Sequence, residues 1–181
     1  MVPRKIEDAF NEQIKYELES AYLYLQMAAY FDAEGLEGMA RWMRAQVQEE
    51  VTHAMRFFKH IVERGGKVKL LTLAQPASEW DSALAVFEAA YKHEQFVTGL
   101  IHKLAALSRE ENDFASQTLL QWFVDEQVEE EDSTSRVAQQ LKLVGKQGNG
   151  LLMLDRELGA RTFVLPPELA ALYAQAPAAQ A

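Results

Sequence analysis

Residues 44–58, RAQVQEEVTHAMRFF, form a helical stripe in which polar side chains take inward positions. Glu50 and His53 stand three residues apart, among apolar residues that recur every three or four positions. Side chains at this spacing share one face of a helix, so both would point into the interior. A buried carboxylate is costly without a partner, and a metal ion is a partner that would account for both residues.

The same pattern recurs along the chain. Glu17 lies 33 residues before Glu50, and Glu94 lies 33 residues before Gln127, which is followed three positions later by Glu130. All of them fall in the middle of long segments with helical periodicity. In a bundle whose helices pair in antiparallel hairpins, these midpoints lie at one level. The sequence therefore predicts that the six residues, His53 included, surround two metal ions at the centre of a bundle.

Four long helices and a short fifth are predicted, at residues 4–32, 37–64, about 78–111, 113–144 and 151–159. The predicted inward residues of the third are Leu84, Phe87, Tyr91, Glu94, Thr98, Ile101 and Ala105. Residues 65–80 lack helical period, contain Pro76 and are long for a bundle loop. They predict a crossover along the bundle, so that the second and third helices run parallel. The expected fold is an all-α four-helix bundle with a long crossover and a short fifth helix.

Residues 1–162 are expected to form one domain, and residues 163–181 a partly disordered tail. Within this tail, Leu169, Leu172 and Tyr173 could dock as one helical turn. The remaining histidines, His60, His93 and His102, have no ligand spacing and are expected at the surface.

Composition narrows the classes of function. The chain has 181 residues, no cysteine and a net charge of −9, which argues against thiolate sites, nucleic acid and anionic membranes as partners. No apolar run reaches the roughly 18 residues of a membrane span. The first residues lead into an amphipathic segment unlike a signal peptide, so a cytoplasmic location is expected.

The predicted ligands are rich in oxygen and include one imidazole, which suits iron or manganese, or more loosely magnesium or zinc. A lone Glu-x-x-His pair on a helix is usually solvated, but six suitable residues in phase on four helices are a specific signal. Tyr24 is either a core tyrosine or a donor to a ligand carboxylate. Trp122 is expected to pack in the core. Glu49, Glu126 and Glu129 form either a solvated charge run or a third cation site.

These segments resemble a ferritin of the non-haem bacterial type. The resemblance is carried by QIKYELESAYLYLQMA (13–28), RAQVQEEVTHAMRFF (44–58), AYKHEQFVTGLI (90–101), WFVDEQVEEE (122–131) and LMLDRELGAR (152–161). It implies an iron-storage ferroxidase that oxidises Fe²⁺ with O₂ or H₂O₂ and keeps the ferric mineral in a cage of twenty-four identical subunits. Val51 occupies the place where bacterioferritins have a haem-ligating methionine, so haem is not expected.

The resemblance also implies a role for each site residue. The first iron would be bound by Glu17, Glu50 and His53. The second iron would be bound by Glu50, Glu94 and Glu130, with Gln127 close by and Tyr24 hydrogen-bonded to the centre. A third iron site would consist of Glu49, Glu126, Glu129 and Glu130.

Other classes stay open on the sequence alone. A rubrerythrin-like peroxide scavenger normally adds a cysteine-ligated iron domain, which a chain without cysteine lacks. Another small-molecule di-iron oxidase would use the same ligands. A DNA-protecting mini-ferritin would place its ligands between subunits, and a purely structural bundle would leave the buried carboxylates without a purpose.

Overall fold

The computed structural model describes residues 1–145 and 148–170, and every regular element within them is helical. The helices are α1 (Arg4–Ala33), α2 (Glu37–Glu63), α3 (Ala83–Glu110), α4 (Phe114–Val144), α5 (Gly148–Leu158) and the 3₁₀ turn η1 (Pro167–Leu169). The predicted all-α bundle with a short fifth helix is confirmed.

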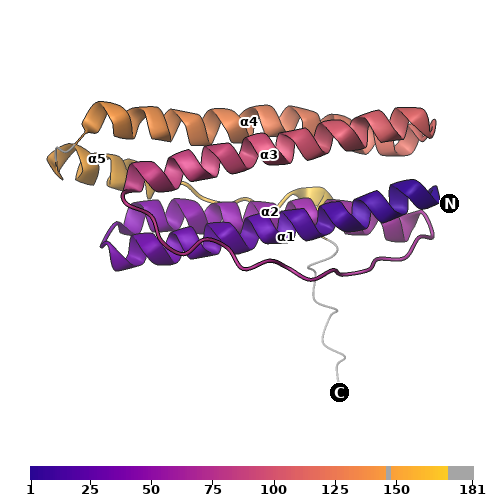
Figure 1. The fold of residues 1–181 in the computed structure, drawn as a ribbon, viewed down its shortest axis with the longest axis horizontal. Coiled ribbons are helices and arrows are strands. Elements are labelled where there is room, and N and C mark those ends of the chain that lie inside the picture. The colour runs from indigo at the N-terminus through magenta and orange to yellow at the C-terminus, as the bar shows by residue number, and fades with distance from the viewer. Residues whose placement is uncertain (146–147, 171–181) are drawn as a thin grey trace, which may run out of the picture.

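The four long helices form two antiparallel hairpins, α1 with α2 and α3 with α4 (Figure 1). The segment between α2 and α3 runs the length of the bundle, so α2 and α3 point the same way, as predicted. Gly65 ends α2 with φ of 71° and Asn112 turns the second hairpin with φ of 53°, both in the left-handed region. The short α5 packs at the end of the bundle opposite the N-terminus.

The interior consists of two hydrophobic clusters with a polar layer between them. The cluster nearer α5 includes Phe31, Met43 and Phe87, and the cluster nearer the N-terminus includes Phe10 and Phe57. Each of these side chains is fully buried, and burying one stabilises the fold by about 1.5–3 kcal/mol. The clusters therefore hold the helices together, and the layer between them is free to carry polar groups.

The third helix differs from its prediction in two respects. It begins at Ala83 because Ser82 is extended and its hydroxyl accepts a hydrogen bond from the Ala85 amide at 3.1 Å. The predicted inward stripe is correct only in part, because Leu84, Tyr91, Thr98 and Ala105 are half-buried. The residues that α3 buries are Ala83, Val86, Phe87, Ala90, Glu94, Val97, Ile101, Leu104 and Ser108.

The segment after α5 turns back and packs on α2. η1 ends at Leu169, which is 1% exposed, and this is the helical turn predicted to dock there. Leu172 and Tyr173, predicted to join it, lie outside the described residues. No helix in the described part of the chain is long and apolar enough to cross a membrane.

Candidate metal centre

The six residues predicted to surround metal ions all lie in the polar layer. Their relative exposures run from 1% to 4%, for Glu17, Glu50, His53, Glu94, Gln127 and Glu130. Each comes from the middle of its helix, where the apolar stripe on either side keeps that face turned inward. The matched spacing in the sequence thus corresponds to one level in the bundle.

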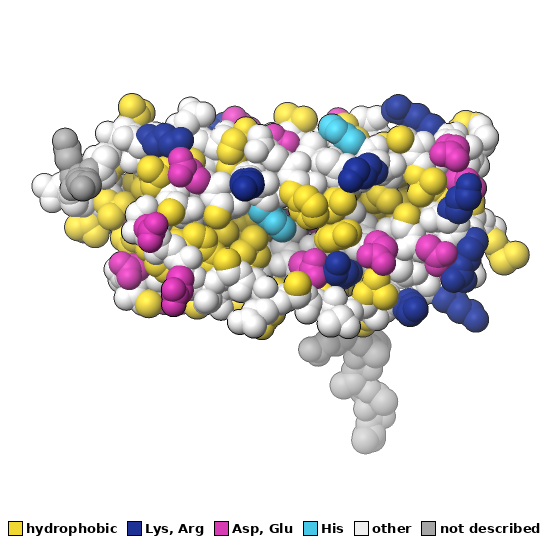
Figure 2. Space-filling model, viewed as in Figure 1, with side chains coloured by type: hydrophobic (Ala, Val, Ile, Leu, Met, Phe, Trp, Pro, Cys, Tyr) yellow, Lys and Arg dark blue, Asp and Glu magenta, His cyan; other side chains and the backbone are white. Residues whose placement is uncertain are grey.

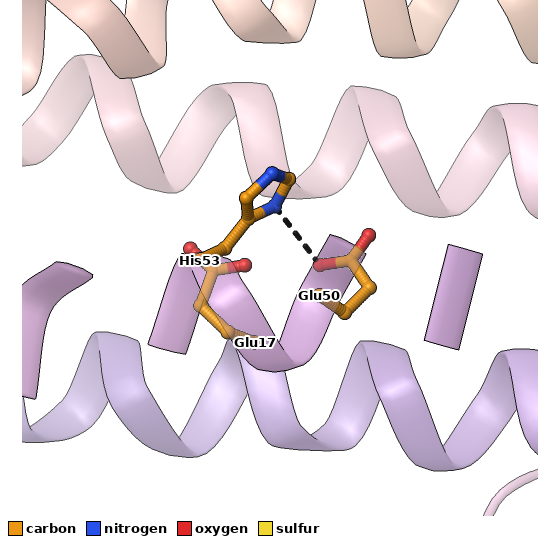
Figure 3. Close-up of side chains that lie close together, drawn as sticks. All are labelled: Glu17, Glu50 and His53. Atoms are coloured by element: carbon orange, nitrogen blue, oxygen red, sulfur yellow. Dashed lines mark ion pairs between the residues drawn. The ribbon is translucent and has the colours of Figure 1, made fainter. Parts of the chain in front are cut away.

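Glu17, Glu50 and His53 form a compact group (Figure 3). One ligand atom from each lies within 4.8 Å of the others, and His53 Nδ1 is 3.4 Å from Glu50 Oε2. The amide of Gln13 donates a hydrogen bond to Glu17 Oε1 at 3.0 Å and holds that carboxylate in place. Two carboxylates and an imidazole at these distances could bind one divalent ion.

Glu94 is held by two neighbours. The Tyr24 hydroxyl donates to Glu94 Oε1, and Gln127 Nε2 donates to Glu94 Oε2 at 3.4 Å. Gln127 also donates to Thr98 Oγ1 at 3.2 Å. Tyr24 is fully buried, so it fills a core position and also orients a candidate ligand.

His53 belongs to a second group with Glu126 and Glu130, whose ligand atoms also lie within 4.8 Å of one another. His53 Nε2 is 3.5 Å from Glu126 Oε1, so the ring lies between carboxylates on both sides. Gln46 Nε2 donates to Glu130 Oε2 at 2.8 Å. Gln46 lies four residues before Glu50 and therefore on the same helix face, and this spacing is the signal in the sequence that could have revealed it.

The residues proposed for a third cation lie in unlike surroundings. Glu126 joins the group just described, whereas Glu129 is exposed and belongs to neither group. Glu49 is half-buried, and its Oε2 lies 2.5 Å from Arg161 Nη2. The sequence assigns Arg161 no role at the site, because this residue ends the quoted segment 152–161 and lies beyond the last predicted helix.

Burial and crowding raise the pKa of the central carboxyls. Burial is the largest cause for Glu17, Glu50 and Glu130. The pKa of Glu94 rises to about 8 through burial and then the charge of Glu130. Burial likewise raises the pKa of Glu49 to about 7, although Arg161 opposes the rise. Protons therefore partly neutralise the layer when no metal is bound.

The pKa of His53 shifts upward, whereas burial alone would lower the pKa of a histidine. Burial favours its neutral form, but hydrogen bonds to Glu126 and Glu50 and the charges of Glu50 and Glu17 outweigh burial. Its pKa therefore lies well above the usual value.

The expectation of three surface histidines is wrong for two of them. His93 is half-buried, its Nε2 lies 2.7 Å from Ser20 Oγ, and burial lowers its pKa to about 4. His60 is half-buried beside Ser116, whose Oγ lies 3.1 Å from His60 Nε2. His102 is exposed, as predicted. Trp122 packs edge-on against His53 with ring centroids 5.5 Å apart, at the border of the second cluster.

The fold and the site together define a four-helix bundle that gathers carboxylates and an imidazole at its centre, an arrangement typical of carboxylate-bound metal pairs. The chain belongs to the ferritin family: the model described as the ferritin-like domain matches residues 7–144. The resemblance seen in the sequence is thereby confirmed.

Named relatives agree with this assignment. The chain is 38% identical to the bacterial non-heme ferritin of Bacteroides fragilis (strain 638R), over 89% of this chain and 100% of the relative. It is 37% identical to the bacterial non-heme ferritin of Escherichia coli O6:H1, over 87% of this chain and 96% of the relative. Among solved structures, an open pore ferritin from Archaeoglobus fulgidus is 50% identical, with a TM-score of 0.88 over 90% of this chain and 100% of that one.

Proposed function

We propose that this protein is an iron-storage ferroxidase of the cytoplasm. The observation that carries the proposal is the convergence of Glu17, Glu50 and His53 within 4.8 Å in a buried layer, with Glu94 and Glu130 at the same level. Oxygen ligands with one imidazole suit Fe²⁺, and the named relatives are ferritins.

In the proposed reaction the substrate is a pair of Fe²⁺ ions. Glu17, Glu50 and His53 bind one ion, and Glu50, Glu94 and Glu130 bind the other, with Gln127 beside them. Each ion gives one electron to the oxidant, so O₂ with two protons leaves as H₂O₂, and H₂O₂ with two protons leaves as two water molecules. Tyr24 positions Glu94 through its hydrogen bond. The raised pKa of the central carboxyls means that protons leave the site as the ions enter.

A third ion would be bound by Glu49, Glu126, Glu129 and Glu130. Glu126 and Glu130 already lie within one group, which supports this part of the proposal. Exposed Glu129 and ion-paired Glu49 would have to turn toward that group.

The proposed assembly is a hollow cage of twenty-four copies of this chain that stores the ferric product. Among the described residues, large apolar side chains remain exposed, including Tyr22, Leu25 and Leu70 at 47%, 49% and 69%. Figure 2 shows such apolar side chains among acidic and basic ones on one face of the bundle. Exposed apolar surface of this kind is typical of contacts between subunits, and particle mass from light scattering would test the assembly.

The decisive experiment compares Fe²⁺ oxidation in Glu50→Ala and His53→Ala with the parent by stopped flow. Loss of a shared ligand should slow oxidation by about five- to 150-fold, because removing one partner of a buried polar group costs about 1–3 kcal/mol. Assembly should persist, since it depends on apolar surfaces. Glu63→Ala and His102→Ala are matched controls, because both residues are exposed. An oxidation rate in Glu50→Ala equal to that of the parent would refute the proposed centre.

A further inference from the structure

Residues 160–169, called the strap here, return from α5 along the outside of α2. Half-buried Arg161, Phe163 and Leu165 alternate with exposed residues at 162 and 164, as in an extended chain with one face against the protein. Phe163 and Leu165 line an apolar hollow together with Val47 and Val51.

The far end of the strap is fastened separately. Glu168 forms an ion pair with Arg56 at 2.5 Å, and Leu169 is 1% exposed. The strap is thus anchored beyond the point where Arg161 reaches the site, so the position of Arg161 is not that of a loose chain end.

Arg161 lies at the edge of the metal centre. Its Nη2 is 2.5 Å from Glu49 Oε2, and its guanidinium carbon is 4.4 Å from the centre of the Trp42 ring. Its Nη1 is buried without a hydrogen-bond partner among the described residues. The side chains of Arg161 and Glu49 are 24% and 23% exposed, so water still reaches the pair.

The charge of Arg161 acts on more than one carboxylate. Burial raises the pKa of Glu49 and of Glu130, and the positive charge of Arg161 opposes this rise at both. Glu130 lies in the group with His53 and Glu126. A guanidinium does not lose its proton in proteins, so a metal ion that needs Glu49 has to displace Arg161 or bind beside its charge.

We propose that Arg161 competes with a metal ion for the third site of Glu49, Glu126, Glu129 and Glu130, and that the strap keeps its guanidinium at Glu49 until an ion displaces it. This inference rests on the third-ion site of the proposed function. An ion pair that is partly open to water is weak enough for a divalent ion to displace. Arg161 is therefore a positioning residue, and it makes the third site weaker than the central two.

Calorimetric titration of the metal-free full-length protein with Zn²⁺ tests the proposal without iron chemistry. In the parent we expect two tighter ions and one weaker ion for each chain. Arg161→Gln should bind the weakest ion about two- to fivefold more tightly, a change that corresponds to losing one partly exposed ion pair, and should leave the other two affinities unchanged. Arg161→Lys should restore the parent affinity in large part, because the positive charge is kept.

Glu168→Gln is the matched control, because it removes the other ion pair of the strap without touching Glu49, while buried Leu169 still fastens the strap. We expect it to leave the affinity for the weakest ion unchanged. Three results would overturn the inference: an unchanged or weaker third affinity in Arg161→Gln, an equal gain in Glu168→Gln, or no third ion in any variant. If one of these results is found while two ions still bind to each chain, the proposed ferroxidase centre stands and only the role of Arg161 is refuted. A protein that binds no ion at all would refute that centre as well.

Discussion

His53 faces a carboxylate from each of its ring nitrogens, Glu50 on one side and Glu126 on the other. Both nitrogens can donate only when the ring carries two protons, which agrees with its raised pKa. An ion bound at Nδ1 requires that nitrogen to lose its proton. A doubly protonated ring between these two carboxylates would supply the positive charge that a bound metal ion would otherwise bring.

Replacing Glu94 with Gln tests whether the central carboxyls repel one another. The folded state holds the Glu94 proton up to a pH of about 8, whereas the unfolded chain loses it near the ordinary value of 4.5. The folded state binds more protons between these values, so the contribution of Glu94 to stability is complete below 4.5 and is lost as the pH rises toward 8. The neutral amide avoids this loss, and metal-free Glu94→Gln should exceed the parent by about 1–3 kcal/mol at pH 8.

The measurement is urea unfolding in EDTA at pH 5 and at pH 8. The gain in stability of Glu94→Gln over the parent should be small at pH 5. Glu88→Gln on the exposed face of α3 is the control and should change stability little at either pH. If Glu94→Gln were less stable than the parent at pH 8, the donors Tyr24 and Gln127 would be holding an ionised carboxylate.

At the scale of single residues, periodicity placed the buried polar side chains but could not place their partners. Glu17, Glu50 and Glu130 interrupt apolar stripes, and such an interruption is visible in a sequence. The contact of Arg161 with Glu49 joins residues 112 positions apart. It depends on the path of an extended segment without helical period, so no local pattern reveals it. His93 was misplaced for a similar reason, because its partner Ser20 lies on another helix.

At the scale of elements, the position of α5 depends on one close approach to α2. A Cβ atom built on Gly38 would lie 1.7 Å from the backbone oxygen of Asp155. The Asp155 carboxylate accepts a hydrogen bond from the Met39 amide at 2.8 Å and satisfies a free donor in the first turn of α2. Helix α5 thus caps α2 from outside, and Gly38 makes room for it.

Gly38→Ala should therefore force α5 away from α2. We expect a loss of about 1–3 kcal/mol from the overpacking, together with loss of the Asp155 cap. Thermal unfolding monitored by circular dichroism provides the measurement. Gly99→Ala is the matched control, because Gly99 lies within α3 with nothing within 4 Å of a built Cβ, and alanine there should be neutral or stabilising by up to about 1 kcal/mol. Equal stability of Gly38→Ala and the parent would show that α5 is not held at this contact.

Helix number, order and antiparallel pairing could be predicted from the sequence, because glycine breaks and long apolar periods mark them. The face of α3 that is buried could not be predicted from the sequence. Phe87, Glu94 and Ile101 fit two neighbouring stripes, one through Leu84 and Tyr91 and the other through Ala83 and Ala90. Both are apolar enough to be buried, and only packing against the other helices selects the second.

At the scale of the whole molecule, metal binding should stabilise the folded four-helix bundle. Zn²⁺ should raise the melting temperature of the metal-free protein, because an ion that binds only the folded state stabilises it by about 2.7 kcal/mol at one hundred times its dissociation constant. The rise should shrink in a variant that combines Glu17→Ala with Glu50→Ala, as differential scanning calorimetry would show. The same rise in that variant would place the stabilising ion elsewhere.

The division of the core into two clusters has a consequence for the motions of the metal-free protein. The polar layer around Glu50 and Glu94 supplies little hydrophobic cohesion, so the bundle has a seam across its middle, with Phe31 on one side and Phe57 on the other. Each half has its own apolar interior and can loosen by itself, which makes the halves separate units of local opening. Amide hydrogens in the seam would then exchange with solvent before those on either side. Bound metal would link the four helices across the seam and slow this exchange.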